Sequence, residues 1–262
     1  MTRGIVALLL TTSTADAIEQ RGARGAAVVS AAGSIGFGAE LLGVKTDKPF
    51  GPYDYSGQLG PKVAGVPVMA AAAWALLARP SRVAGDWAAR ALAGGSTGAV
   101  PKIAETPSLA FRTTRVVAAA TALTAWDVFL DPRMVREGSW RWPGGGRYEG
   151  IPATNFLGWW ATGIVLFAAA ELVDPADDPA APAPAPVMGG ERSGDIALGL
   201  YAWTWIGEVI ANLHLWKRPT VAIAGGLSMA LVAVPAIAQR LLAQRSGGSP
   251  AEAVLRPPKR RA

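Results

Sequence analysis

The stretch ATNFLGWWATGIVLFAAAELV, residues 153–173, decides the fold class of this chain. Its first charged side chain is Glu171, so almost the whole stretch is uncharged. A helix needs about 20 predominantly apolar residues to cross roughly 30 Å of hydrocarbon. The stretch is therefore predicted to be a transmembrane helix.

Comparable apolar segments occur along the rest of the chain. They lie at 4–19, 25–44, 63–79, 110–132, 194–213 and 219–241. The first is the least apolar, and small residues near Ala17 are also compatible with a signal peptide, but we favour a shortened first span. Together the segments predict an all-α fold, a polytopic transmembrane helical bundle of about seven spans.

Residues 82–97 form a further helical candidate with a different pattern. Arg82, Asp86 and Arg90 are spaced four apart and share one helix face, whereas Val83 and Trp87 lie on the opposite face. A helix with one charged and one apolar face is typical of the membrane interface. We therefore predict an interfacial amphipathic helix that does not span.

Two polar regions complete the domain organisation. Residues 174–193 are rich in Pro and Ala and are predicted to be a linker between the membrane helices of 1–173 and those of 194–242. The basic stretch 243–262 is predicted to be a disordered tail.

Composition limits the class of protein and its chemistry. The 262 residues are 51% hydrophobic and only 17% charged, below the roughly 25% charged residues of soluble domains. This predicts a multi-pass integral protein of the cell membrane. The absence of Cys and the single His214 exclude thiolate and multi-histidine metal sites, so no metal is expected. The net charge of +6 suits anionic lipid at basic loops better than nucleic acid.

Ionisable side chains inside apolar segments are candidates for function because each is costly to insert into a membrane. Glu40 ends the segment 25–44, where Gly33 and Gly36 precede it on the same face. Asp127 and Asp131 are four apart, so both carboxylates lie on one side of a helix. Each acid also has a structural interpretation as an interfacial carboxylate paired with Lys or Arg.

Glu208 lies in a polar stripe through the segment 194–213, with Tyr201, Thr204 and Asn212 at helical spacing. The stripe could line a site, or it could form the interhelical hydrogen bonds that fix helix packing.

The number of spans between them indicates that the two loops richest in polar and aromatic residues lie on the same side of the membrane. If 82–97 does not span, one span separates the segments ending at Glu40 and Asp131, so these two run parallel. The loops 45–62 and 133–151 then emerge on the same side of the membrane, together with the start of 153–173. This predicts one composite site at that end.

Three blocks carry a family resemblance. They are GAELLGVKTDKPFGPYDYSGQLGPKVAGVP (38–67), TAWDVFLDPRMVREGSWRW (124–142) and GRYEGIPATNFLGWW (146–160). In this order they resemble the membrane-integral carotenoid hydratases of the CruF type, which include the bisanhydrobacterioruberin and γ-carotene hydratases. The resemblance covers roughly residues 25–215. It implies a hydro-lyase that adds water across the terminal isopropylidene double bond of an acyclic carotenoid end, with no redox cofactor.

Alkene hydration needs a protonated acid, electron-rich groups around a carbocation, and a held water. Buried, paired carboxyls can stay protonated near neutral pH, and aromatic faces attract cations. The candidate acids, in order of preference, are Asp127, Glu40 and Asp131. Trp140 and Trp142 have interfacial anchoring as their alternative role. The candidate substrate- and water-binding residues are Thr46, Phe50, Tyr53, Tyr55, Trp140, Trp142, Asn155, Trp159 and Glu208.

The resemblance implies an acyclic or monocyclic carotenoid and membrane lipid as partners, and allows other enzymes of the carotenoid pathway. Two other readings remain open. A small membrane lycopene cyclase would also begin by protonating an end group. A non-enzymatic carotenoid-binding or transport protein would use the Glu208 stripe as a pathway. Prenyl transfer is disfavoured, because DVFLD offers only two of the several carboxylates that a Mg²⁺–diphosphate site needs.

Overall fold

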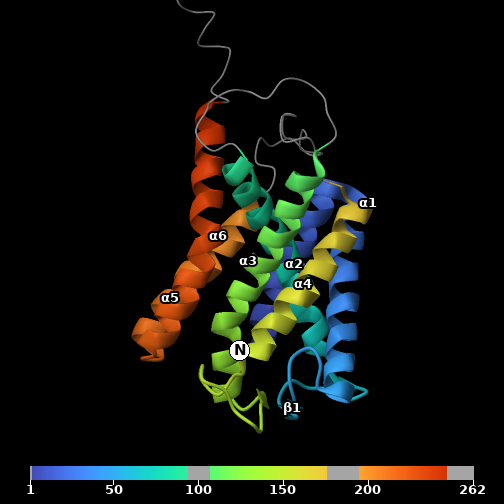
Figure 1. The fold of residues 1–262 in the computed structure, drawn as a ribbon, viewed down its shortest axis with the longest axis vertical. Coiled ribbons are helices and arrows are strands. Elements are labelled where there is room, and N and C mark those ends of the chain that lie inside the picture. The colour runs from blue at the N-terminus through green and yellow to red at the C-terminus, as the bar shows by residue number, and fades with distance from the viewer. Residues whose placement is uncertain (1, 94–106, 176–194, 247–262) are drawn as a thin grey trace, which may run out of the picture.

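The computed structural model describes residues 2–93, 107–175 and 195–246, and these form an elongated helical bundle (Figure 1). The helices are α1 (Thr2–Thr46), α2 (Val68–Ala93), α3 (Leu109–Arg136), α4 (Ala153–Val173), α5 (Asp195–Ile210), the π-helical turn η1 (Ala211–Leu215) and α6 (Pro219–Ser246). Four two-residue strands lie in the loops: β1 (Asp54–Tyr55), β2 (Lys62–Val63), β3 (Val66–Pro67) and β4 (Trp140–Arg141). The prediction of an all-α fold is confirmed.

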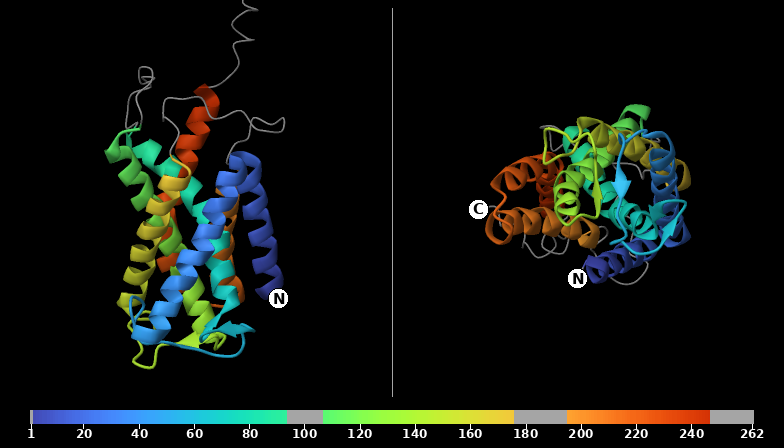
Figure 2. Two further views of the ribbon diagram at one scale, coloured as in Figure 1. Left: turned by 90° about the vertical axis from the view of Figure 1, so that its right-hand side faces the viewer. Right: turned by 90° about the horizontal axis from the view of Figure 1, so that it is seen from below.

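Helix α1 is two helices joined by a sharp reversal. Gly22 has φ 57° and ψ −137°, a left-handed conformation that glycine adopts without a steric penalty. The limb before Gly22 and the limb after it run in opposite directions (Figure 2). A Cβ on Gly25 would lie 2.0 Å from the carbonyl oxygen of Ala17, so a glycine is needed where the limbs meet. The two limbs correspond to the predicted segments 4–19 and 25–44.

The predicted interfacial helix at 82–97 is wrong. Residues 82–93 continue α2 without a break, and residues 94–97 lie outside the described part of the chain. Arg82, Val83 and Ala84 are all buried in the bundle. The charged face that suggested an interface instead meets charges on neighbouring helices.

These charges form an ion network at the end of the bundle opposite the strands. Arg82 lies 2.5 Å from Asp174, which also binds Arg21 at the reversal of α1. Arg115 of α3 reaches both Asp86, at 3.1 Å, and Glu171, at 3.3 Å. The network therefore ties α1, α2, α3 and the end of α4 together.

Asp174 caps α4 and is buried, so it belongs to the bundle and not to the predicted linker. Burial alone would raise its pKa, but the hydrogen bond from Arg21 and the charge of Arg82 hold the pKa of this carboxyl below its usual value. The predicted linker beyond residue 175 lies outside the described residues. The predicted tail begins too early, because α6 extends to Ser246, and the rest of that tail is also outside them.

Within the described ranges, four helices are long and apolar enough to cross a membrane. They are Gly4–Thr46, Ala153–Val173, Asp195–Leu215 and Pro219–Gln244. Large apolar side chains also face outward, among them Leu157, Leu231 and Leu8, which are 66%, 73% and 66% exposed. Such a surface is what contact with lipid requires. Helices α2 and α3 are not in this set, so the count of about seven spans stays a prediction.

Two loops far apart in the sequence are joined by strand pairing. β1 and β4 are antiparallel, with Asp54 opposite Arg141 and Tyr55 opposite Trp140. The second limb of α1 and α3 therefore end on the same side of the bundle, where α4 begins (Figure 1). This arrangement agrees with the prediction that the two loops share one end.

Candidate active site

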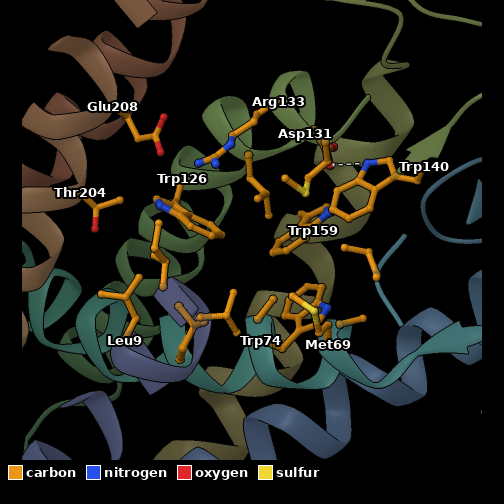
Figure 3. A pocket seen from close by; sticks show the side chains of 18 of the residues that line it. Leu9, Met69, Trp74, Trp126, Asp131, Arg133, Trp140, Trp159, Thr204 and Glu208 are labelled. Atoms are coloured by element: carbon orange, nitrogen blue, oxygen red, sulfur yellow. Dashed lines mark hydrogen bonds between the residues drawn. The ribbon is translucent and has the colours of Figure 1, made fainter. Parts of the chain in front are cut away.

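A cavity of about 430 Å³ lies in the bundle near the end that carries the paired loops (Figure 3). Its walls are mostly apolar and aromatic. Ten of the candidate residues line it: Glu40, Phe50, Tyr53, Tyr55, Asp131, Trp140, Trp142, Asn155, Trp159 and Glu208. The structure thus brings together residues from α1, α3, α4, α5 and both loops.

Asp127 and Asp131 are joined by one amide. Both carboxylates are buried, and the Nδ2 group of Asn155 donates to Oδ2 of Asp127 at 3.0 Å and to Oδ2 of Asp131. Trp140 donates from Nε1 to Oδ1 of Asp131 at 3.1 Å. Two carboxylates this close repel each other when both are ionised, so the arrangement favours one proton held by the pair.

The two aspartates differ in their access to the cavity. Asp131 lines it, whereas Asp127 is fully buried behind and is not part of the wall. The second oxygen of Asp127, Oδ1, is buried without a hydrogen-bond partner among the described residues. If this carboxyl carries a proton, no unpaired negative charge is buried at Oδ1. The geometry therefore favours Asp131 over Asp127 as the group that meets a substrate, the reverse of the order expected from sequence.

Glu40 is held by three donors. Its carboxylate accepts from Tyr53 Oη at 2.5 Å, Tyr55 Oη at 2.8 Å and Trp74 Nε1 at 3.2 Å. Burial, and then the charge of Glu40, raises the pKa of Tyr53 and of Tyr55, so both phenols remain protonated donors. A carboxylate with this many donors is stabilised in its charged form. These donors offset part of the cost of burying the carboxylate, and they occupy both of the oxygens through which Glu40 would pass on a proton.

Aromatic rings surround the acid groups. Trp74 and Trp159 are stacked, with ring centroids 4.0 Å apart. Tyr55 meets Trp140 edge to face at 5.7 Å, and Trp142 is fixed by a 3.0 Å hydrogen bond from its Nε1 to the carbonyl of Phe50. Trp140 and Trp142 thus lie in the cavity wall, which differs from the alternative of membrane anchoring.

Two candidates lie apart from this cluster. Thr46 is exposed and does not line the cavity; its hydroxyl donates to the carbonyl of Leu42 at 2.8 Å, as a residue at a helix end does. Glu208 lines the cavity from α5, and Figure 3 shows it with Thr204 on the side away from Asp131 and Trp140. Its Oε2 accepts from Asn212 at 3.3 Å, within the polar stripe.

Sequence reasoning missed Trp74, which binds Glu40 and forms part of the wall. A single Trp in the Ala-rich start of α2 is typical of a packed core. The glycine at position 36, on the helix face that carries Glu40, is the feature of the sequence that relates to this ring. A Cβ added to Gly36 would lie 2.0 Å from Cγ of Trp74, so the glycine leaves room for the indole. Trp126, Trp203 and Arg133 also line the cavity and were not among the candidates.

The donor set of the site is carboxylate, phenol, indole and amide. In the described part of the chain, no group of three or more His, Cys, Asp or Glu could hold a metal ion. The chemistry that these residues can perform themselves is proton transfer next to electron-rich rings.

Comparison with known proteins assigns the chain to a family. The family described as "Carotenoid biosynthesis protein" matches residues 3–234, nearly the whole described bundle. No curated protein and no solved structure matches the chain. Because the family match includes every residue of the site, we conclude that this chain belongs to the carotenoid biosynthesis protein family.

Proposed function

We propose that this protein adds water across the terminal isopropylidene double bond of an acyclic carotenoid end group, as the hydratases of the CruF type do. The observation that carries the proposal is the Asp127–Asn155–Asp131 unit, a carboxyl pair that favours one shared proton and presents Asp131 to an aromatic, apolar cavity. An apolar end group fits such a cavity, and an acid is the one catalyst that alkene hydration cannot omit.

The reaction proceeds in two steps. Asp131 donates its proton to the less substituted carbon of the double bond; the π bond breaks, a C–H bond forms, and the neighbouring carbon becomes a tertiary cation. A water oxygen then bonds to that cation, and the proton it releases returns to the aspartate pair. The sum is alkene plus water giving a tertiary alcohol, with the acid regenerated.

The surrounding groups stabilise the cation. Faces of rings such as Trp159 and Trp140 contribute about 0.5–2 kcal/mol each by cation–π attraction in a dry site. In its ionised form, which its three donors stabilise, Glu40 favours the cation over the neutral alkene. Tyr53 and Tyr55 thereby act through Glu40.

The setting we propose is a multi-pass protein of the cell membrane. In this proposal the two limbs of α1 and the helices α2 to α6 are the seven spans expected from the sequence. The substrate is an acyclic or monocyclic carotenoid dissolved in the lipid, and other enzymes of the same pathway are its expected partners.

Expression in a lycopene-producing bacterium, followed by mass spectrometry of the extracted pigments, tests the proposal. We expect a mass gain of one water for each reacting end. An unchanged mass with a shifted chromatographic peak would instead assign a cyclase. Unaltered lycopene that copurifies with the protein would assign a binding protein, and either result overturns the hydratase.

A further inference from the structure

The residues that line the cavity are buried on one side of it and exposed to the outside of the bundle on the other. Around the acid groups the lining residues are deeply buried; Asp131 and Trp74 are each 1% exposed. On the other side, Trp203 of α5 and Leu215 of η1 also line the cavity and are 62% and 74% exposed. A residue can line a cavity and face outward at once only at the rim of an opening.

This rim lies between α5 and the first limb of α1. The limb contributes Ile5, Val6 and Leu9 to the lining, and α5 contributes Trp203, Thr204 and Gly207. The two elements are in contact, and the view from below shows them side by side (Figure 2). In Figure 3, Leu9 and Thr204 lie on the side of the cavity away from Trp140.

The rim is apolar where it meets the outer surface. Helix α1, taken over Gly4–Thr46, and the segment Asp195–Leu215 are among the helices apolar enough to cross a membrane. The exposed side chains next to the opening, Leu8 on α1 and Ile206 on α5, are 66% and 51% exposed. An opening with such a border leads into lipid and not into water.

Gly207 keeps the opening wide. It lines the cavity, and a Cβ added to it would meet no atom of the described residues within 4 Å, so the space beside its Cα is open in the described part of the bundle. A side chain at this position would therefore extend into the passage.

On the basis of the proposed function, we infer that the gap between the first limb of α1 and α5 is a lateral portal. Through it one end of the polyene enters from the bilayer, while the remainder of the chain stays between Trp203 and the lipid. The enzyme then contacts only the reacting end and the adjoining polyene. Gly207 is a specificity-determining residue, because it admits a long rigid chain.

The test uses Gly207→Trp with two substrates, in the full chain purified in detergent. The substrates are lycopene and geranylacetone, a short flexible molecule with the same isopropylidene end. We expect Gly207→Trp to lower the hydration of lycopene about tenfold or more, since a bulky ring must be displaced from a tight passage. Hydration of geranylacetone should stay near the rate of the unaltered protein, which also shows that the variant is folded.

Gly199→Trp is the matched control. Gly199 is on the same helix, has no atom within 4 Å of its added Cβ, and does not line the cavity. This variant should hydrate both substrates normally. The portal is refuted if Gly207→Trp hydrates lycopene at the unaltered rate, or if it loses both substrates equally.

Bound lycopene, quantified in the purified protein, separates this inference from the proposed function. If the unaltered protein retains lycopene without hydrating it, the hydratase is refuted, and the portal still predicts less pigment in Gly207→Trp than in Gly199→Trp. Equal pigment in the two variants refutes the portal. If the unaltered protein neither binds nor hydrates lycopene, both proposals fail.

Discussion

The amide of Asn155 has two hydrogens and serves two carboxylates with them. At the scale of single residues, the proposed reaction depends on this sharing, because two carboxylates on one amide favour holding a proton between them. Among the residues that the structure describes, neither aspartate has a basic side chain as its hydrogen-bond partner; Asp131 instead has the indole of Trp140. The pair therefore lowers its charge by holding a proton.

Replacing Asp131 by Asn should abolish most of the activity, with a loss of stability of about 1–3 kcal/mol. The amide keeps the shape but accepts through one oxygen only, so it loses the hydrogen bond from either Asn155 or Trp140, and it has no acidic proton to give. A positioned general acid contributes about 10²–10⁴-fold. The measurement is the rate of alcohol formation, with thermal unfolding of the same sample. Asp54→Asn is the control, since Asp54 is exposed and outside the cavity. Normal hydration by Asp131→Asn would remove this residue from the acid role.

The sequence revealed much of this cluster, because carboxylates in apolar segments stand out and their spacing of four places them on one face. The sequence could not decide which carboxyl is the best candidate for the proton donor, because that depends on which carboxyl oxygen reaches the cavity. Thr46 was a candidate from its place in a motif, but its hydroxyl closes a helix end. Trp74 was missed because an apolar ring on an apolar helix looks the same in a core and in a site.

At the scale of elements, the contact between the second limb of α1 and α2 sets the position of Trp74. Gly36 lies against the indole, and Trp74 in turn binds Glu40 and stacks on Trp159. The packing of two helices is thus part of the site.

Gly36→Ala should destabilise the protein by about 1–3 kcal/mol, because the new methyl overlaps the Trp74 ring and must move it. It should also change the near-UV circular dichroism of the stacked indoles. Gly38→Ala is the control on the same limb, where a Cβ meets nothing within 4 Å. There the gain in helix propensity should leave stability unchanged or raised by up to about 1 kcal/mol. Equal unfolding temperatures for the two variants would contradict this account.

The errors at this scale have one cause. A helix with one charged face looks alike whether that face meets water or buried partners, and only the tertiary structure distinguishes them. Arg82 and Asp86 suggested an interfacial helix, yet they point at charges on α3 and α4. The reversal of α1 at Gly22 lies in the polar gap between the apolar segments 4–19 and 25–44, which the sequence already separates into two spans.

At the scale of the whole molecule, the ion network and the cavity occupy opposite ends of the bundle. The network joins four elements through buried arginines, and breaking one partner of a buried pair costs about 3–5 kcal/mol. The network therefore fixes the end of the bundle that lies away from the cavity.

Asp174→Asn should lower the thermal stability and change its dependence on pH. Because the pKa of Asp174 is lower in the folded protein than in the unfolded chain, its contribution is present above the unfolded pKa of about 3.9 and is lost as pH falls through the folded pKa. From about pH 5 downward, the unaltered protein should lose stability more steeply than the variant. Thermal unfolding across this range measures it.

The exposed variant Asp54→Asn is the control for the stability at neutral pH, where its unfolding temperature should match that of the unaltered protein. If the curve of Asp174→Asn against pH ran parallel to that of the unaltered protein, the network would contribute nothing through this carboxyl.

The strand pair β1–β4 has a consequence for redesign. Its backbone bonds hold the two loops in register whatever side chains they carry, and the pairing sorts those side chains. Tyr55 and Trp140 turn inward to the cavity, while Asp54 and Arg141 are exposed outside it. Mutant libraries that vary only Tyr55 and Trp140 would change the shape of the cavity for other terpenoid end groups. Asp54 and Arg141 could carry labels or surface attachments without changing the cavity.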